Sequence, residues 1–273
     1  MRSPASRHPP PGRAGVMNGQ VHIGTSGWSF RDWKGVFYPK DLPDKERFAY
    51  YTRFFDCAEI NSTYYAIPKP KVFETLAESA PEGFQFLVKL HKETTHAGDN
   101  PLAAVQALHE VTTPLREAGK FAGYLGQFPY AFKNDEGSRR LLAGLRSELP
   151  EVPVFIEFRH ASWLKQPVFE YLATHDLGYV CVDEPSLKGL LPPQTITTTG
   201  TGYIRLHGRN AGTWWHSDKG DRYDYSYSED ELQEWVTRIQ EMQKRVSKLY
   251  IFFNNCHHGQ APLNARQMQA FFS

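Results

Sequence analysis

PVFIEFRH (153–160) is one of eight segments that have the length and the apolar content of buried β-strands. The other seven are VHIGTSG (21–27), CAEINSTY (57–64), QFLVKL (85–90), GYLGQFP (123–129), GYVCVDEP (178–185), GYIRLHG (202–208) and KLYIFFNN (248–255). Mostly helical patterns separate these segments. Residues 185–201 are the exception, because two adjacent prolines and a run of threonines predict a loop in place of a sixth helix. Eight strands alternating with helices predict an α/β protein, a single TIM-like (β/α)8 barrel with its active site at the carboxyl ends of the strands.

Each of these segments carries a polar residue, although strands buried on both faces are normally runs of Val, Ile and Leu. The polar residues are His22, Glu59, Asn61, Lys89, Gln127, Glu157, Arg159, Asp183, Arg205, His207, Asn254 and Asn255. Residues two apart in a strand share a face. If the polar faces all point inward, one cavity gathers three carboxylates and three cations: Glu59, Glu157 and Asp183 with Lys89, Arg159 and Arg205. Because an unpaired buried charge is costly, such groups are expected to be paired or functional.

The mixture of charges suggests how this cavity would act on a substrate. Lys89, Arg159 and Arg205, together with Arg209, could hold a phosphate or a carboxylate, since arginine suits bidentate contacts. Burial raises the pKa of a carboxyl group, so Glu59, Glu157 or Asp183 could serve as a general base. A lysine buried near other cations could instead be neutral enough for Schiff-base chemistry. The remaining polar side chains would orient the substrate through hydrogen bonds: Asn61, Gln127, His207, Asn254 and Asn255.

A structural explanation of the same charges is a buried ion-pair network that fills the barrel. Hydrophobic replacements of buried ion pairs are often neutral or stabilising, so six buried charges are a poor means of gaining stability. The two explanations predict different mutants. A functional cluster would lose ligand binding without losing stability, whereas a structural network would lose stability.

Aromatic side chains indicate the mouth of the same site. Trp28, Trp163 and Trp214 all follow predicted strands, and the segment 208–228 adds tyrosines, arginines and a lysine. Aromatic rings among cations suit stacking on a base or packing against a sugar. The structural alternative is a lid whose tryptophans pack on one another.

Neither a metal nor a cofactor is predicted. The sequence contains no HxH, HExxH or paired CxxC spacing, and the three cations among the candidate residues would repel a metal cluster. It also lacks the glycine-rich loops that bind nucleotide phosphates.

Composition indicates one compact domain, residues 20–273. Residues 1–19 are rich in Pro, Arg and Gly and predict a disordered tail, in which Met17 is an alternative start. Outside the first sixteen residues there are 28 basic and 30 acidic residues, so the overall basic excess of a non-specific nucleic-acid binder is missing. Three unpaired cysteines are typical of a cytoplasmic protein. No run of eighteen apolar residues predicts a membrane span.

Several motifs together resemble the DUF72 family, also called YecE-like. They are TSGW (25–28), EINSTYY (59–65), TH (95–96), GQFP (126–129), EFRHASW (157–163), DEP (183–185), YIRLHGRN (203–210) and FFNNCHHGQAPLNA (252–265). The resemblance covers residues 21–273 and implies a TIM-barrel-like fold, in agreement with the strand count. It implies no established reaction. The family's barrel has been compared with endonuclease IV, which suggests a DNA-related role.

Three hypotheses follow for function. The first is an enzyme that binds a polar, anionic small molecule, such as a phosphorylated sugar or a nucleotide-like compound, with acid–base chemistry by buried carboxylates. The second is a metal-dependent nucleic-acid phosphodiesterase resembling endonuclease IV. The third is a module that binds a ligand without turning it over. Nucleic acid is not the favoured partner, because the net charge of −2 outside the tail gives little long-range attraction to a polyanion.

Overall fold

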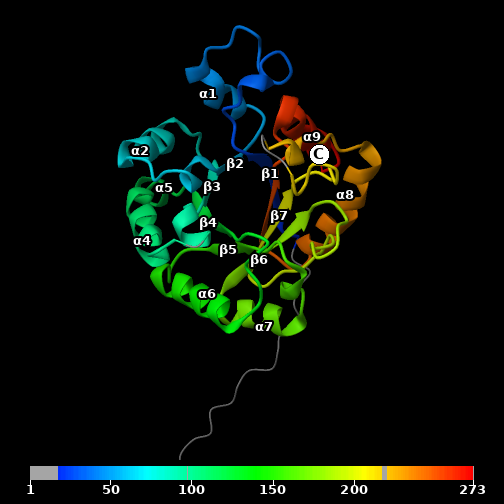
Figure 1. Cartoon of the computed structure of the whole chain (residues 1–273). Helices are drawn as coiled ribbons and strands as arrows, with labels where there is room; N and C mark the ends of the chain where they lie inside the picture. Colours follow the sequence, from blue (N-terminus) through cyan, green and yellow to red (C-terminus); the bar gives the residue numbers. More distant parts are fainter. Residues whose placement is uncertain (1–17, 97, 217–219, 273) are drawn as a thin grey trace, which may run out of the picture.

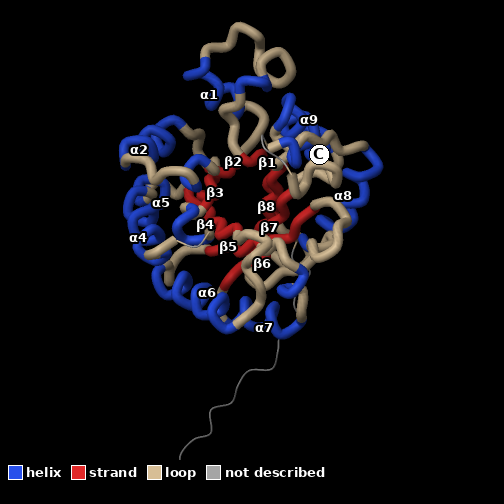
Figure 2. The backbone as a smooth tube through the Cα atoms, viewed as in Figure 1, coloured by secondary structure: helices blue, strands red, loops and turns tan. Residues whose placement is uncertain are grey.

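The computed structural model describes residues 18–96, 98–216 and 220–272. Eight parallel strands close into a barrel in the order of the sequence, and β8 pairs with β1. The strands are β1 (Gln20–Ser26), β2 (Cys57–Ile60), β3 (Gln85–Lys89), β4 (Phe121–Gln127), β5 (Val154–Glu157), β6 (Leu177–Asp183), β7 (Thr201–Leu206) and β8 (Lys248–Phe253). Figure 2 shows the strands as an inner ring with the helices outside it. The predicted TIM-like barrel is confirmed.

Helices surround this ring, most of them as an outer layer, while the helix between β1 and β2 lies apart from the others (Figure 1). They are α1 (Arg47–Tyr51), α2 (Pro70–Ser79), α3 (Lys92–Thr95), α4 (Pro101–Val111), α5 (Thr113–Glu117), α6 (Glu136–Glu148), α7 (Gln166–Thr174), α8 (Glu229–Gln243) and α9 (Gln260–Ala270). Between β6 and β7, residues 184–200 contain no helix, so the loop predicted in place of a sixth helix is confirmed.

Local sequence signals explain where several helices begin and end. Proline occupies the first turn of α2, α4 and α7, where a missing backbone N–H removes no helical hydrogen bond. The helix α8 begins with a capping box, in which Ser228 and Glu231 satisfy each other's backbone N–H groups. Pro114 occupies the first turn of α5, directly after the end of α4. Such signals set where these helices begin between successive strands of the barrel.

The predicted tail, residues 1–19, falls almost entirely outside the described residues, so it stays a prediction. Gly19 is described, and its backbone N–H donates to the carbonyl of Gln243 over 2.9 Å. The first strand begins at the next residue.

Candidate functional site

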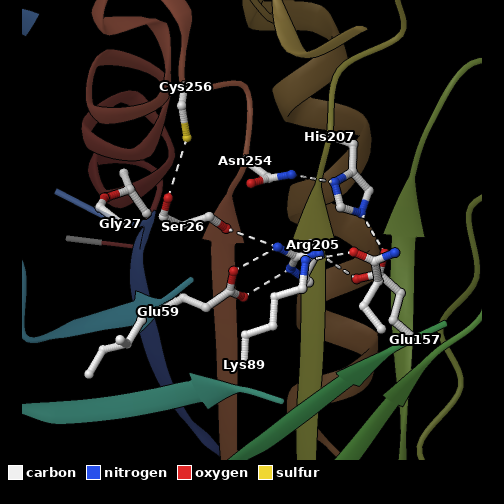
Figure 3. A network of polar contacts seen from close by, with 12 residues as sticks. Ser26, Gly27, Glu59, Lys89, Glu157, Arg205, His207, Asn254 and Cys256 are labelled. Carbon is white, nitrogen blue, oxygen red and sulfur yellow. Dashed lines mark hydrogen bonds and ion pairs between the residues drawn. The ribbon is translucent and has the colours of Figure 1, made fainter. Parts of the chain in front are cut away.

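The carboxyl ends of the strands place four charged side chains together inside the barrel. Glu59 comes from the end of β2, Lys89 from β3, Glu157 from β5 and Arg205 from β7. Figure 3 shows all four pointing toward one another. Glu59 and Glu157 are fully buried, and the side chain of Arg205 is 1% exposed. The four side chains therefore lie together inside the barrel as predicted, but of the four only Lys89 lines the cavity described below.

Arg205 is the centre of this cluster and is held on three sides. Its Nε and Nη2 donate to the two carboxylate oxygens of Glu59 over 2.9 and 2.6 Å. Its Nη1 donates to Glu157 Oε2 over 2.6 Å, and Nη2 also reaches Ser26 Oγ at 3.4 Å. Tyr203 donates its hydroxyl hydrogen to Glu59. Burial opposes the charge on Arg205, but Glu157 and Glu59 outweigh it and raise its pKa well above the usual range.

Arg159 forms a second ion-pair centre beside the first. Its Nη2 lies 2.9 Å from Glu157 Oε1, and its Nη1 lies 2.9 Å from Glu184 Oε2. Burial opposes ionisation of Glu157, but Arg205 and Arg159 outweigh it and hold the pKa of its carboxyl well below the usual range. Burial raises the pKa of Glu184 to about 7, although Arg159 favours its charged form. Glu157 thus bridges the two arginines and is a poor proton acceptor.

His207 lies beside Glu157 and is a neutral imidazole. Asn254 Nδ2 donates to His207 Nδ1 over 2.9 Å, and His207 Nε2 donates to Glu157 Oε1 over 3.1 Å. Burial, followed by the charge of Arg159, lowers the pKa of His207 to about 3. Asn254 is therefore held through its amide nitrogen, and it lies on the wall of a cavity.

Lys89 differs from the two arginines in its surroundings. Its Nζ donates to Gln127 Oε1 over 2.7 Å and lies 4.7 Å from the centroid of the Tyr64 ring. Within the part of the chain that the structure describes, no carboxylate oxygen lies within 4.0 Å of it. Burial, followed by the charge of Arg205, lowers the pKa of Lys89 to about 7. A large fraction of this amine is therefore neutral near pH 7.

A cavity of about 390 Å³ opens above Lys89 at the carboxyl face of the barrel. Its lining includes Asn61, Tyr64, Tyr65, Lys89, His96, Gln127, Arg222, Tyr223 and Asn254. An adjoining hollow of about 150 Å³ shares part of this lining and adds Arg159 and Trp214. The guanidinium carbon of Arg159 lies 5.4 Å from the centroid of the Trp214 ring. Several of the predicted substrate-binding residues therefore surround one space large enough for a small molecule.

Asp183 was predicted inside the cavity, and this prediction is wrong. Its carboxylate lies 2.9 Å from Arg209 Nε, and Arg209 also reaches Glu231 and Glu234 of α8. The opposite face of β6 points inward, since a side chain at Gly178 would collide with the ring of Phe155 inside the barrel. Asp183 therefore faces the helical layer.

Arg209 was predicted to bind the anion, but its guanidinium is held by these carboxylates outside the barrel. Burial opposes its charge, whereas the hydrogen bond and charge of Asp183 raise its pKa above the usual range. Arg209 connects β6 to α8 in this structure.

Three further residues that were predicted to bind substrate, Trp163, Trp28 and Asn255, make packing contacts or hydrogen bonds with other parts of the protein. The buried ring of Trp163 stacks on Phe158 at 4.1 Å, and its Nε1 donates to the carbonyl of Phe132. Trp28 packs against Phe48 of α1 at 5.1 Å. Asn255 has a separate set of partners, the carbonyl of Tyr225 and the amide oxygen of Asn264. Their contacts are with helices and loops around the barrel and, for Trp28, also with Phe86 of β3 at 6.0 Å.

The predicted site residues did not include several side chains that the structure places at the site, among them Glu184, Tyr64, Tyr65 and His96. Tyr223 also lines the cavity, and it belongs to the aromatic and basic segment 208–228 that the sequence did indicate. Glu184 takes the inward place that had been assigned to Asp183, and the two are adjacent in sequence. His96 and Tyr64 lie in motifs that carry the resemblance to DUF72, which is the signal that could have indicated them. Burial, followed by the charge of Lys89, lowers the pKa of His96 to about 4.

Among the described residues, no group of three or more His, Cys, Asp or Glu side chains is placed to hold a metal ion. The helices of residues 18–96, 98–216 and 220–272 are all too short or too polar to cross a membrane.

Comparison with known proteins places the chain in a family. The profile of the family described as "Protein of unknown function DUF72" matches residues 22–273. The YunF protein of Bacillus subtilis is 27% identical over 265 residues, which span 91% of this chain and 93% of YunF. The YecE protein of Escherichia coli is 28% identical over 150 residues, which span 55% of this chain and 50% of YecE.

Solved structures agree with this result. A DUF72 family protein from Thermotoga maritima is 38% identical, with a TM-score of 0.87 over 93% of this chain and 99% of that protein. A second, from Enterococcus faecalis, shares the fold at 24% identity, with a TM-score of 0.83 over 92% of this chain and 94% of that one. The chain belongs to the DUF72 family.

Proposed function

We propose that this protein is an enzyme that binds a small polar molecule with an anionic group in the cavity above Lys89. The observation that carries the proposal is the state of Lys89, a half-buried amine on the cavity wall with no carboxylate in ion-pair range among the described residues. An amine held without a counter-ion in a protein is expected to meet one in its ligand. A phosphate or carboxylate group would fill that role.

The two arginines support this site indirectly. Arg205 and Arg159 were expected to clamp the anion, but both are held by carboxylates of the barrel. Their charges instead disfavour a proton on Lys89. An anion in the cavity would favour the protonated form of Lys89. Binding of the anion would therefore be coupled to proton uptake by this amine.

Catalysis through Glu59 or Glu157 is less favoured by the geometry. Both carboxylates accept short hydrogen bonds from Arg205, and the pKa of Glu157 is held well below its usual range. A group that transfers protons near neutral pH should titrate near that pH. Lys89 meets this requirement and also borders the cavity, so we assign the proton transfer to it.

The two arginines of the cluster disfavour the hypothesis of a metal-dependent phosphodiesterase. A divalent metal would have to take Glu59 or Glu157 from the guanidinium group of Arg205, and Arg159 would remain within 2.9 Å of Glu157. Positive charges so close to a cation are unfavourable. A binding module without turnover would use the same cavity, so only an assay of product formation separates it from an enzyme.

A thermal-shift screen tests the proposal. The panel should contain sugar phosphates, nucleotides, organic acids, divalent metals and short single-stranded DNA. A ligand at one hundred times its dissociation constant stabilises by about 2.7 kcal/mol. We expect at least one small anion to raise the melting temperature, and the Lys89→Met variant to lose this response relative to its own unliganded state.

Lys244→Met is the matched control, because Lys244 is exposed on the surface and pairs with Glu241. It should respond to the anion like the parent protein. An equal response in Lys89→Met would place the anion elsewhere, and a response only to metals or DNA would favour the phosphodiesterase hypothesis.

A further inference from the structure

We propose that Lys89 is a nucleophile that forms an imine with a small substrate carrying both a carbonyl group and an anionic group. This inference rests on the proposed function, because it uses the same cavity, and it adds the class of substrate and the covalent step. The structure supports it by the position of the amine, by its hydrogen bond, and by the charges around it.

The position of the amine suits attack on a bound molecule. Lys89 lies at the carboxyl end of β3 and lines the cavity of about 390 Å³. Gln127 Oε1, 2.7 Å away, accepts one of its hydrogens, and the ring of Tyr64 lies on another side at 4.7 Å. A neutral amine held through one N–H keeps its lone pair for a ligand.

Other lysines of the described chain lack this combination. Lys120 donates to the carbonyls of Ala77 and Ala80 over 2.6 and 2.5 Å, as a structural cation does. Lys34, Lys71 and Lys244 pair with surface carboxylates. Lys89 combines a cavity, a single neutral acceptor and nearby cations, which is the setting that activates an amine.

Charged and titratable groups on several helices, strands and loops surround Lys89. They are Glu59 of β2, Tyr64 after β2, His96 after α3, Glu157 of β5, Arg159 after β5 and Arg205 of β7. Burial and Arg205 outweigh Glu157 and Glu59 and bring the pKa of the amine to about 7, so the neutral and protonated forms are both populated near pH 7. At pH 7 its neutral fraction is on the order of a thousandfold larger than that of an ordinary exposed lysine.

The covalent step balances without an oxidant or a reductant. Lys89 Nζ attacks the carbonyl carbon, and the two hydrogens of the neutral amine leave with the carbonyl oxygen as water. A C=N bond replaces the C=O bond, and a proton taken up by nitrogen gives the iminium ion. Water added to this ion restores the amine and the carbonyl, so the lysine is recovered after each turnover.

The anionic group of the substrate would lie toward the outer part of the cavity. Arg222 and His96 line this space together with Lys89. An iminium ion is positive, so a phosphate or carboxylate on the same molecule would also compensate the new charge. This is why the substrate class includes an anion as well as a carbonyl.

Reductive methylation with formaldehyde and cyanoborohydride at pH 7 tests the amine alone. Limiting reagent is applied, and the methylated lysines are identified by peptide mass spectrometry. We expect Lys89 to react at least tenfold faster than Lys92 and Lys188, which are exposed. Methylation of Lys89 at or below the rate of these two lysines would overturn the proposal.

Pyruvate and methyl pyruvate test the anionic half of the proposal. Methyl pyruvate is the stronger electrophile and carries no charge, so simple reactivity favours it. We expect pyruvate with cyanoborohydride to label Lys89 faster than methyl pyruvate does, and the Lys89→Met protein to yield no adduct at this position. Faster labelling by methyl pyruvate would refute recognition of the anion.

A Lys89→Arg variant separates this inference from the proposed function. Arginine keeps a cation beside the cavity but forms no imine under these conditions. We expect it to keep a thermal response to the anion found in the screen and to lose the pyruvate adduct. An anion response in the parent protein without any adduct at Lys89 would refute the imine and leave the proposed function standing. Adduct formation without an anion response would refute the anion site.

Discussion

Replacing Lys89 with methionine should make the protein more stable at pH 7. The half-buried amine has its pKa lowered from 10.5 to about 7 by burial and by Arg205, which means that the folded state disfavours the proton that the unfolded chain holds. Methionine has a similar length and carries no charge. The substitution therefore removes an unfavourable feature of the folded state, as expected where a functional group is retained at a cost in stability.

The size of the effect follows from the two pKa values. A difference of about 3.5 corresponds to about 4–5 kcal/mol at and below pH 7, at 1.36 kcal/mol per pKa unit. The variant also loses the hydrogen bond to Gln127, worth about 1 kcal/mol. We therefore expect a net gain of about 3 kcal/mol at pH 7, which is a rise in melting temperature of roughly 6–12 °C for a domain of this size.

The effect has a defined dependence on pH. Between pH 7 and 10.5 the unfolded chain binds a proton at Lys89 that the folded protein does not bind, so the unfolding free energy of the parent protein rises with pH. The gain from Lys89→Met should accordingly fall to about 1 kcal/mol at pH 9. Urea unfolding of both proteins at pH 7, 8 and 9 measures this difference. A variant that is less stable than the parent at pH 7, or a difference that does not change with pH, would refute the reasoning.

Three further outcomes are expected from stability and binding measurements. Glu157→Gln should destabilise by about 3–5 kcal/mol in urea unfolding, because it leaves the buried Arg205 short of a carboxylate, whereas Glu136→Gln in an exposed pair should cost at most about 1 kcal/mol. The contribution of Glu157, whose pKa is lowered, should be present above the unfolded value near 4.5 and be lost as the pH falls below it, as an acid titration of unfolding would show. Asp183→Asn should weaken the contact with Arg209 by about 1–3 kcal/mol and leave anion binding unchanged. A loss of anion binding in calorimetry would show that Asp183 belongs to the binding site.

The barrel was predictable from sequence because each of its strands is a short apolar segment bounded by turn residues. The loop between β6 and β7 was predictable for a local reason, since adjacent prolines cannot both continue a helix. The tryptophans after the strands were harder to place. Trp28 and Trp163 lie beyond the last paired residues, where alternation no longer fixes direction, and both turn toward the helical layer.

Strand β6 shows where alternation itself is insufficient. Its two faces, Val180 with Val182 and Tyr179 with Cys181, are both apolar and buried, so either of them could have faced the interior. The face that includes Gly178 points inward because the ring of Phe155 on β5 fills that space. This contact depends on two neighbouring strands, and a single strand's pattern does not contain it. Glu184 therefore replaced Asp183 in the cluster.

The state of Lys89 depends on geometry in the same way. The corrected cluster still has three cations and three carboxylates, and their equal numbers predict complete pairing. In the structure, however, each guanidinium group binds two carboxylates, and Glu157 is shared between Arg159 and Arg205. Two arginines therefore engage all three carboxylates and leave the amine of Lys89 with the neutral oxygen of Gln127. The sequence identified five of the six charged residues of the cluster, whereas the forked shape of arginine determines which cation remains available to a ligand.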